Sequence, residues 1–135
     1  MGAGFKVCLR LPNAIGARPR SLATLAAGWD GRAFGLVDDG VLVGYGELWI
    51  DDDEVEIAHL IVDPARRRQG VGRRLVEALA VVARSYDRTT VCLRVHPDNS
   101  AAIRVYLASG FHDVDDAIAA EWNVGQPVTY RWLVG

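Results

Sequence analysis

The pattern of apolar and polar positions divides the chain into short strand-like runs, followed by a strand–helix–strand–helix series. Alternating or β-branched apolar runs bounded by turn residues predict strands. The predicted strands lie at residues 5–11, 32–37, 41–50, 54–62, 89–95, 111–114 and 128–134. Apolar residues recur at helical spacing from Val71 to Val82, which predicts a helix reaching about Tyr86. This order predicts an α/β fold around one mixed sheet, with a βαβ unit in its second half.

Turn and cap residues set the remaining boundaries. Asp38-Asp39-Gly40 predicts a hairpin turn between two strands. Asn99 is expected to open a second helix, which Gly110 closes at its C-terminal end. Residues 21–29 are expected to form a short helix capped by Ser21. The segment 115–126 is expected to be irregular.

Length, charge and cysteine content limit the classes of function that the chain can have. A chain of 135 residues predicts one domain with a proper core. The formal net charge of −2 gives no basic excess for neutralising a nucleic-acid backbone, so no nucleic-acid partner is expected. Cys8 and Cys92 each stand in an apolar run, which favours buried reduced thiols and an intracellular compartment. With no apolar run of transmembrane length, we expect a cytoplasmic protein without a membrane partner.

The segment after the strand 54–62 has the features of an anion site. The strand ends at Asp63-Pro64, a cluster of arginines follows at 66–68, and Gly70-Val71-Gly72 leads into a helix. The first N–H groups of a helix are free, the helix dipole favours negative charge, and glycine lets a phosphate approach the backbone. A phosphate-bearing ligand is therefore expected here.

The spacing of the glycines limits which ligand this is. A P-loop needs a lysine and a hydroxyl residue after its second glycine, and none follows Gly72. A dinucleotide-binding turn needs a third glycine where Leu75 stands. What remains is Arg67-x-x-Gly70-x-Gly72. This R-x-x-G-x-G turn resembles the pyrophosphate-binding motif of the GNAT superfamily of acetyl-CoA-dependent N-acetyltransferases.

A second motif supports the resemblance. The pattern N-x-x-A-x-x-x-Y-x-x-x-G-F runs from Asn99 to Phe111 and is similar to the second signature of that superfamily. The two motifs together cover residues 55–111. The resemblance implies a GNAT-like single domain, in which a mixed sheet of about six to seven strands has splayed central strands and is flanked by about three to four helices. It also implies acetyl-CoA as the acetyl donor, bound between the splayed strands.

The resemblance assigns roles to individual residues. The pyrophosphate is expected at Arg67, Arg68, Gln69, Gly70, Val71 and Gly72. The backbone of Leu60, Ile61 and Val62 is expected to bind the pantetheine arm. Asn99 is expected to hydrogen-bond the same arm while capping its helix. Tyr106 is expected to protonate or hold the departing CoA thiolate. The alternative for Tyr106 is plain packing on the core-facing side of its helix.

The base that deprotonates the acceptor is less defined. Glu56 stands where histone-acetylating members of the superfamily carry their general base, although it could instead continue a solvated strand end. Glu47 could do the same work through a water molecule. His59 alternates to the opposite face from Glu56, which favours a packed strand histidine. The branch that acetylates ribosomal-protein N-termini carries a glutamate where Arg94 stands here. This departure argues against assignment to that branch, although much of the remaining pattern fits it.

The resemblance leads to an enzyme that moves an acetyl group to a primary amine of a small molecule, peptide or protein. The acidic residues 51–54 favour a cationic amine, although they could form only a solvated turn. A non-catalytic CoA-binding sensor or regulatory module of the same fold and a polyphosphate binder are the two alternatives. The sequence leaves the oligomeric state open, with a homodimer as one possibility. His96 and His112 lack metal-like spacing, so no metal is expected.

Overall fold

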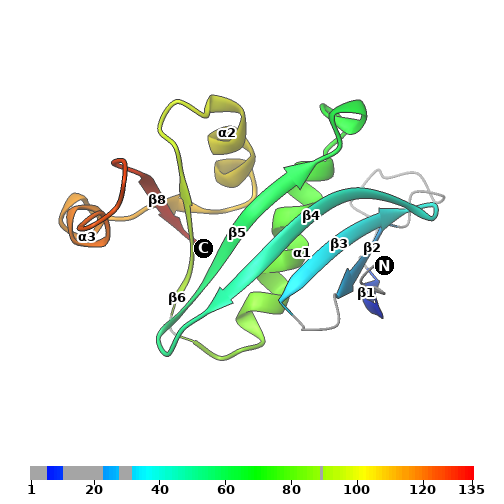
Figure 1. Cartoon of the computed structure of the whole chain (residues 1–135), viewed down its shortest axis with the longest axis horizontal. Helices are drawn as coiled ribbons and strands as arrows, with labels where there is room; N and C mark the ends of the chain where they lie inside the picture. Colours follow the sequence, from blue (N-terminus) through cyan, green and yellow to red (C-terminus); the bar gives the residue numbers. More distant parts are fainter. Residues whose placement is uncertain (1–5, 11–22, 28–31, 89) are drawn as a thin grey trace.

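The computed structural model describes residues 6–10, 23–27, 32–88 and 90–135, and these form one mixed sheet with helices packed beside it (Figure 1). The strands are β1 Lys6–Arg10, β2 Ala23–Ala27, β3 Ala33–Asp38, β4 Val41–Ile50, β5 Glu54–Val62, β6 Thr90–Val95, β7 His112–Asp113 and β8 Arg131–Val134. The helices are α1 Val71–Arg84, α2 Ser100–Ala108 and α3 Asp116–Trp122, with a 3₁₀ turn η1 at Pro64–Arg66.

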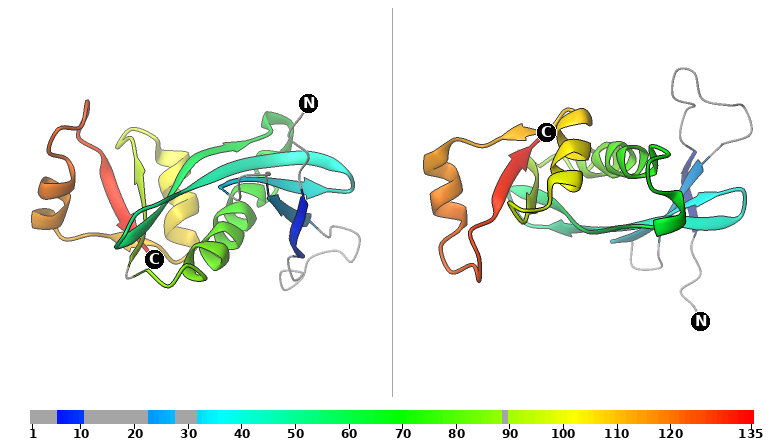
Figure 2. Two further views of the ribbon diagram at one scale, coloured as in Figure 1. Left: turned by 60° about the horizontal axis from the view of Figure 1, so that its bottom comes forward. Right: turned by 90° about the horizontal axis from the view of Figure 1, so that it is seen from above.

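The sheet divides at the boundary between β5 and β6. Its strand order is β1-β2-β3-β4-β5-β6-β8-β7, and β5–β6 is the parallel pair within the described strands. That pair is in register only from Glu54 opposite Thr90 to Glu56 opposite Cys92. Beyond Glu56 the two strands diverge, which leaves an opening between them (Figures 1 and 2). The expected splay of the central strands is confirmed.

Helix α1 covers one face of the sheet beside this opening (Figure 2). Its apolar residues at helical spacing, among them Leu75, Leu79 and Ala83, are fully buried. They pack with Leu48 and Ile57, which are also buried. Because side chains alternate along a strand, the neighbours Glu47, Trp49 and Glu56 lie on the opposite face of β4 and β5. The two carboxylates described below, Glu47 and Glu56, come from that second face.

A β-bulge interrupts the alternation in β5. Tyr45 pairs with Ile61 and Glu47 pairs with Ala58, so Gly46 faces two residues, His59 and Leu60. His59 adopts a left-handed backbone with φ of 52°. Gly46 accommodates the crowding, because a Cβ there would lie 2.5 Å from Leu79 Cδ1 and 2.9 Å from Leu60 Cδ2. The bulge changes the direction of the side chains that follow Ala58.

Most boundaries agree with the pattern of the sequence, and two expected elements are wrong. Within the segment 21–29, residues 23–27 form strand β2, paired with β1 and β3, instead of a helix. This short Ala-rich run takes its structure from the sheet edges on both sides, which override helix propensity. Ser21, the expected cap, lies outside the described residues. The segment 115–126 contains helix α3, which begins after Asp115 with the acidic Asp116 in its first turn.

The fold class is confirmed as an α/β arrangement with one mixed sheet and splayed central strands. The described part contains eight strands where about six to seven were expected, and β2 is the additional one. Its three α-helices agree with the expected three to four. None of the helices in the described ranges is long and apolar enough to cross a membrane.

Candidate active site

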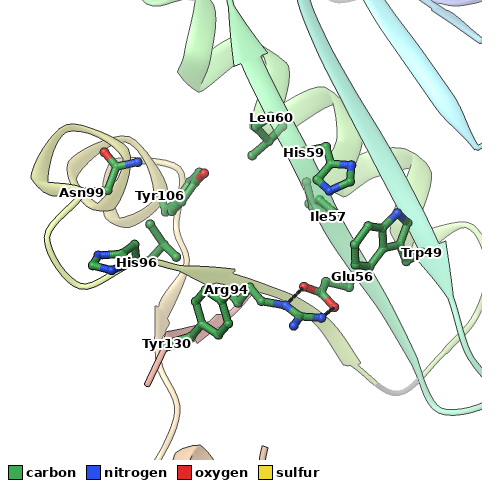
Figure 3. A pocket seen from close by; sticks show the side chains of 12 residues that line it. Trp49, Glu56, Ile57, His59, Leu60, Arg94, His96, Asn99, Tyr106 and Tyr130 are labelled. Atoms are coloured by element: carbon green, nitrogen blue, oxygen red, sulfur yellow. Dashed lines mark hydrogen bonds and ion pairs between the residues drawn. The ribbon is translucent and has the colours of Figure 1, made fainter. Parts of the chain in front are cut away.

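A cavity of about 290 Å³ lies at the point where β5 and β6 separate. Its walls come from β4, β5, β6, α2 and the segment before β8 (Figure 3). The lining residues are Trp49, Glu56, Ile57, Ala58, His59, Leu60, Arg94, Val95, His96, Asn99, Tyr106 and Tyr130. Of the expected site residues, the structure therefore brings Glu56, Leu60, Asn99 and Tyr106 together in one cavity.

Helix α2 presents Tyr106 to the cavity. The Asn99 side chain accepts a hydrogen bond of 3.2 Å from the N–H of Ala102, which fixes the start of the helix. Tyr106 follows two turns later and reaches the cavity wall with a side chain that is largely buried (Figure 3). Burial raises the pKa of the Tyr106 phenol. The group therefore keeps its proton near neutral pH, as a general acid must.

Glu56 lies in the cavity as expected, and it is bound to Arg94. Arg94 Nε donates to Glu56 Oε2 at 2.6 Å, and Nη2 donates to Oε1 at 2.8 Å. The two side chains are 26% and 11% exposed. This planar, two-point contact is the strongest arrangement that arginine and a carboxylate form. The hydrogen bonds from Arg94 occupy both oxygens of Glu56.

Aromatic rings surround the guanidinium of Arg94. Its Cζ lies 4.8 Å from the ring centroid of Trp132, 5.5 Å from that of Tyr130 and 5.8 Å from that of Trp49. Nη1 also donates to Gln126 Oε1 at 2.8 Å. The hydrogen bond to Glu56 is the main reason that the pKa of Arg94 is raised. Arg94 is therefore a fixed part of the cavity wall.

A second carboxylate, Glu47 on β4, is held by three neighbours. Its Oε2 accepts from the Tyr45 hydroxyl at 2.7 Å, and its Oε1 accepts from Trp49 Nε1 at 2.9 Å. His59 Nδ1 lies 3.2 Å from the same Oε1. The hydrogen bond from Tyr45, followed by that from Trp49, lowers the pKa of Glu47. Glu47 is thus an ionised carboxylate beside an imidazole.

The expectation that His59 is a packed strand histidine is wrong. Its side chain is 61% exposed and lines the cavity on the same side as Glu56. Its ring contacts Trp49 edge to face at 4.9 Å. The reason is the bulge opposite Gly46, which shifts the alternation of β5 by one residue. A strict two-residue period in the sequence cannot reveal such a shift.

The arginine- and glycine-bearing turn lies at the other end of β5, ahead of α1. Arg67, Arg68, Gln69 and Gly70 are exposed there. Arg68 has φ of 65°, which is uncommon for a residue other than glycine. The N–H of Arg74 donates to the carbonyl of Gly70 at 3.1 Å, so the amides of residues 71–73 precede the helical ladder. Arg66 instead lies 3.9 Å from Asp38.

The two glycines of the turn have different structural roles. Gly70 has φ of 76°, and a Cβ there would meet nothing within 4 Å. Gly72 lies inside α1, where a Cβ would contact Val105 at 3.6 Å and Val62 at 3.7 Å. Gly70 thus supplies the left-handed turn, whereas Gly72 allows α1, α2 and β5 to lie close together.

Several residues of the cavity carried no recognisable signal in the sequence. Tyr130 and Trp49 belong to neither sequence motif, and Arg94 stands out in the sequence only as a departure from one branch of the superfamily. The acidic residues Asp51, Asp52 and Asp53 form the turn between β4 and β5 and are not among the lining residues.

Comparisons with known proteins agree with this geometry. A model of the acetyltransferase (GNAT) family matches residues 9–111, a span that includes β5, α1, β6 and α2. The chain is 32% identical to the [ribosomal protein bS18]-alanine N-acetyltransferase of Escherichia coli over 80 residues, which are 59% of this chain and 54% of that protein. It is 37% identical to the N-alpha-acetyltransferase RimI of Mycobacterium tuberculosis over 84 residues, which are 59% of this chain and 51% of that protein. The chain thus matches about half the length of these curated relatives.

Solved structures give the same picture. The ribosomal-protein-S18-alanine N-acetyltransferase from Escherichia coli superposes with a TM-score of 0.59 and 25% identity, covering 76% of this chain and 66% of that one. PaiA N-acetyltransferase from Thermoplasma acidophilum, in complex with coenzyme A, superposes with a TM-score of 0.60 and 20% identity. The match covers 76% of this chain and 58% of that one. At its lower identity the second comparison establishes the shared fold alone.

Proposed function

Since the chain belongs to the acetyltransferase (GNAT) family, we propose that it transfers an acetyl group from acetyl-CoA directly to a primary amine. The observation that supports this most is the cavity at the splay, where the protonated Tyr106 phenol faces an opening between two strands. A module that only senses CoA has no need of a proton donor there. The retained phenol therefore favours the enzyme over the sensor.

The residues present fit acetyl-CoA from end to end. The exposed Arg67 and Arg68 and the free amides ahead of α1 suit the pyrophosphate. The edge of β5 that has left β6, at Leu60, Ile61 and Val62, suits the amide-bearing arm, because strand edges need hydrogen-bond partners. The side chain of Asn99 lies beside the same opening and serves as the helix cap.

The proposed reaction is a direct displacement at the thioester. The neutral amine attacks the carbonyl carbon, the C–N bond forms, and the C–S bond then breaks to release the CoA thiolate. Tyr106 gives its hydroxyl proton to that thiolate and recovers a proton from the acetylated nitrogen. An N–H on the free edge of β5 polarises the carbonyl oxygen. One further proton must leave the acceptor ammonium before attack.

Glu56 is the residue that the resemblance suggested for this first proton. Its position in the cavity supports the proposal. The contact with Arg94 makes Glu56 a weaker candidate for the base, because hydrogen bonds from Arg94 occupy both of its carboxylate oxygens.

We propose a primary amine of a peptide or small molecule as the acceptor. The Escherichia coli relative is by name an alanine N-acetyltransferase of a ribosomal protein, and the resemblance implies that this branch carries a glutamate where Arg94 stands here. Glu47 supplies the negative charge that attracts an ammonium group. The buried free thiol of Cys92 is consistent with a reducing cytoplasmic compartment.

An amine panel tests the proposal. Release of CoA thiol is measured with acetyl-CoA and, in turn, spermidine, lysine and a short peptide with N-terminal alanine. Turnover with at least one amine, above the rate without amine, is the expected result. Stabilisation of the fold by acetyl-CoA, seen as a higher Tm without turnover of any amine, favours the sensor instead.

A further inference from the structure

We infer that His59 is the general base that takes the proton from the acceptor ammonium, and that Glu47 positions its ring. The inference rests on the proposed acetyl transfer and adds a residue that the sequence pattern assigned to packing. Three observations support it: the bulge in β5, the contact with Glu47, and the engagement of Glu56 by Arg94.

The bulge presents the imidazole to the cavity. His59 has φ of 52°, a left-handed conformation that is strained for a residue other than glycine. Such a conformation persists only where the surrounding structure requires it. As a result, the His59 side chain is 61% exposed and lines the cavity from the β5 side. Figure 3 shows His59 on β5 and Tyr106 on α2 on the two sides of the opening. A base and an acid thus face the same space from different elements.

The contact with Glu47 selects one tautomer of the ring. Glu47 is ionised and can only accept, so His59 Nδ1, 3.2 Å from its Oε1, carries the hydrogen. In the neutral ring Nε2 then holds the lone pair and can accept a proton. Tyr45 and Trp49 hold the carboxylate by hydrogen bonds of 2.7 and 2.9 Å, so its orientation is fixed from β4. Glu47 Oε1 remains the acceptor for the Nδ1–H when Nε2 takes up a proton.

The other ionisable groups on this face are less suited. Both oxygens of Glu56 accept from Arg94. His96 Nδ1 accepts from the backbone N–H of Asp98 at 3.2 Å, and the Asp98 carboxylate, which is 91% exposed, lies 3.6 Å from the same nitrogen, beyond hydrogen-bond distance. Glu47 itself is not among the lining residues. Among the described residues of the cavity, only His59 has an exposed ring with a carboxylate oxygen within hydrogen-bond distance, at 3.2 Å.

The proton balance of the step is complete. His59 Nε2 accepts one proton from R–NH₃⁺, which leaves R–NH₂ with the lone pair that attacks the thioester. The resulting imidazolium gives its proton to solvent after product leaves. The net reaction converts R–NH₃⁺ and acetyl-CoA to the acetamide, CoA thiol and one proton in solution.

Chemical rescue tests the role of His59. His59→Gly fits the left-handed backbone without strain and leaves a space for added imidazole. We expect a loss of kcat of roughly 10²-fold with acetyl-CoA affinity retained. Added imidazoles should restore the rate, and more basic imidazoles should restore it more. His112→Gln, at an exposed histidine on β7 outside the cavity, is the matched control and should keep the wild-type rate.

The outcomes separate this inference from the proposed function. If the wild-type protein acetylates an amine and His59→Gly does so at the same rate, the proposed function stands but the inference about His59 is overturned. A loss that no imidazole restores also overturns it, because it assigns His59 a structural role. If the wild-type protein acetylates no amine of the panel, the proposed function fails and the inference fails with it. Glu47→Gln should lower kcat less than His59→Gly does, since the ring stays but loses its charged partner.

Discussion

Arg94 and Glu56 form a two-point ion pair across the parallel strands β5 and β6, with N···O distances of 2.6 and 2.8 Å. The pair lies where the strands separate, because Glu56 is in the last registered position, opposite Cys92, and Arg94 is two residues farther along β6. It therefore closes the inner end of the splay. In this pair the Glu56 carboxylate has a structural role, although the superfamily resemblance suggested it as the general base.

Replacing Arg94 with Met should destabilise the fold by about 2–3 kcal/mol, because it leaves the largely buried Glu56 carboxylate without its partner. The double variant Glu56→Gln/Arg94→Met should recover a large part of that loss. Urea denaturation of both variants and of each single variant measures the coupling.

The exposed pair Arg131–Asp113 provides the matched control. It has the same two distances, 2.6 and 2.8 Å, with side chains 37% and 48% exposed. Arg131→Met should cost at most about 1 kcal/mol, since solvent screens an exposed pair. Equal losses for Arg94→Met and Arg131→Met would contradict the structural role given to Arg94.

Gly70→Val should weaken acetyl-CoA binding, because a β-branched residue cannot adopt φ of 76° without distorting the turn ahead of α1. Gly40→Val is the matched control, since Gly40 has the same φ and equally open surroundings but lies at the tip of the β3–β4 hairpin. Calorimetric titration of both folded variants gives the comparison. If Gly40→Val lowers the affinity as much as Gly70→Val, the turn has no specific part in cofactor binding.

Much of the fold could be predicted because local signals and the final structure agree. Strand β5 has the predicted bounds, and the Asp39-Gly40 turn and the Asn99 cap lie where their side-chain chemistry requires. β2 and α3 could not be predicted in this way. A five-residue strand formed by alanine, threonine and leucine is defined by its partners in the sheet. A helix of seven residues has too few turns for its apolar period to be detected in the sequence.

Tyr106→Phe should lower kcat by roughly 10²-fold and leave acetyl-CoA affinity nearly unchanged, because only the proton donor is removed. Burial raises the pKa of the phenol above its ordinary value of 10.0, so the wild-type group stays protonated through neutral and mildly alkaline pH. Tyr86→Phe, at the end of α1 and away from the cavity, serves as the control. Matching kcat values for wild type and Tyr106→Phe would restore the packing interpretation of this residue.

Glu47 should contribute stability that depends on pH. Its folded pKa lies below the ordinary 4.5, so the contribution is present above that value and is lost as pH falls through the folded pKa. Glu47→Gln should therefore cost about 1–2 kcal/mol near neutral pH and progressively less below about pH 4. Urea denaturation of wild type and variant over this range tests it. A difference that stays constant with pH would show that the hydrogen bonds do not favour the ionised form.

The site could be predicted only in part, for a related reason. The turn at Arg67–Gly72 and the stripe from Asn99 to Tyr106 are local patterns, and the structure forms the turn and the helix that they predict. The orientation of His59 depends on a bulge opposite Gly46 on another strand. The pairing of Arg94 with Glu56 joins residues 38 positions apart. Such contacts depend on the register between strands, which no single segment encodes.

Amine-dependent formation of an acetylated product is the most direct test of the central claim. The purified protein is incubated with acetyl-CoA and each amine of the panel, and mass spectrometry measures the mass of the amine over time. The account predicts that one amine gains a single acetyl group at a rate that falls roughly 10²-fold in Tyr106→Phe. Acetyl-CoA binding with no acetylated amine, or equal product in wild type and Tyr106→Phe, would contradict it.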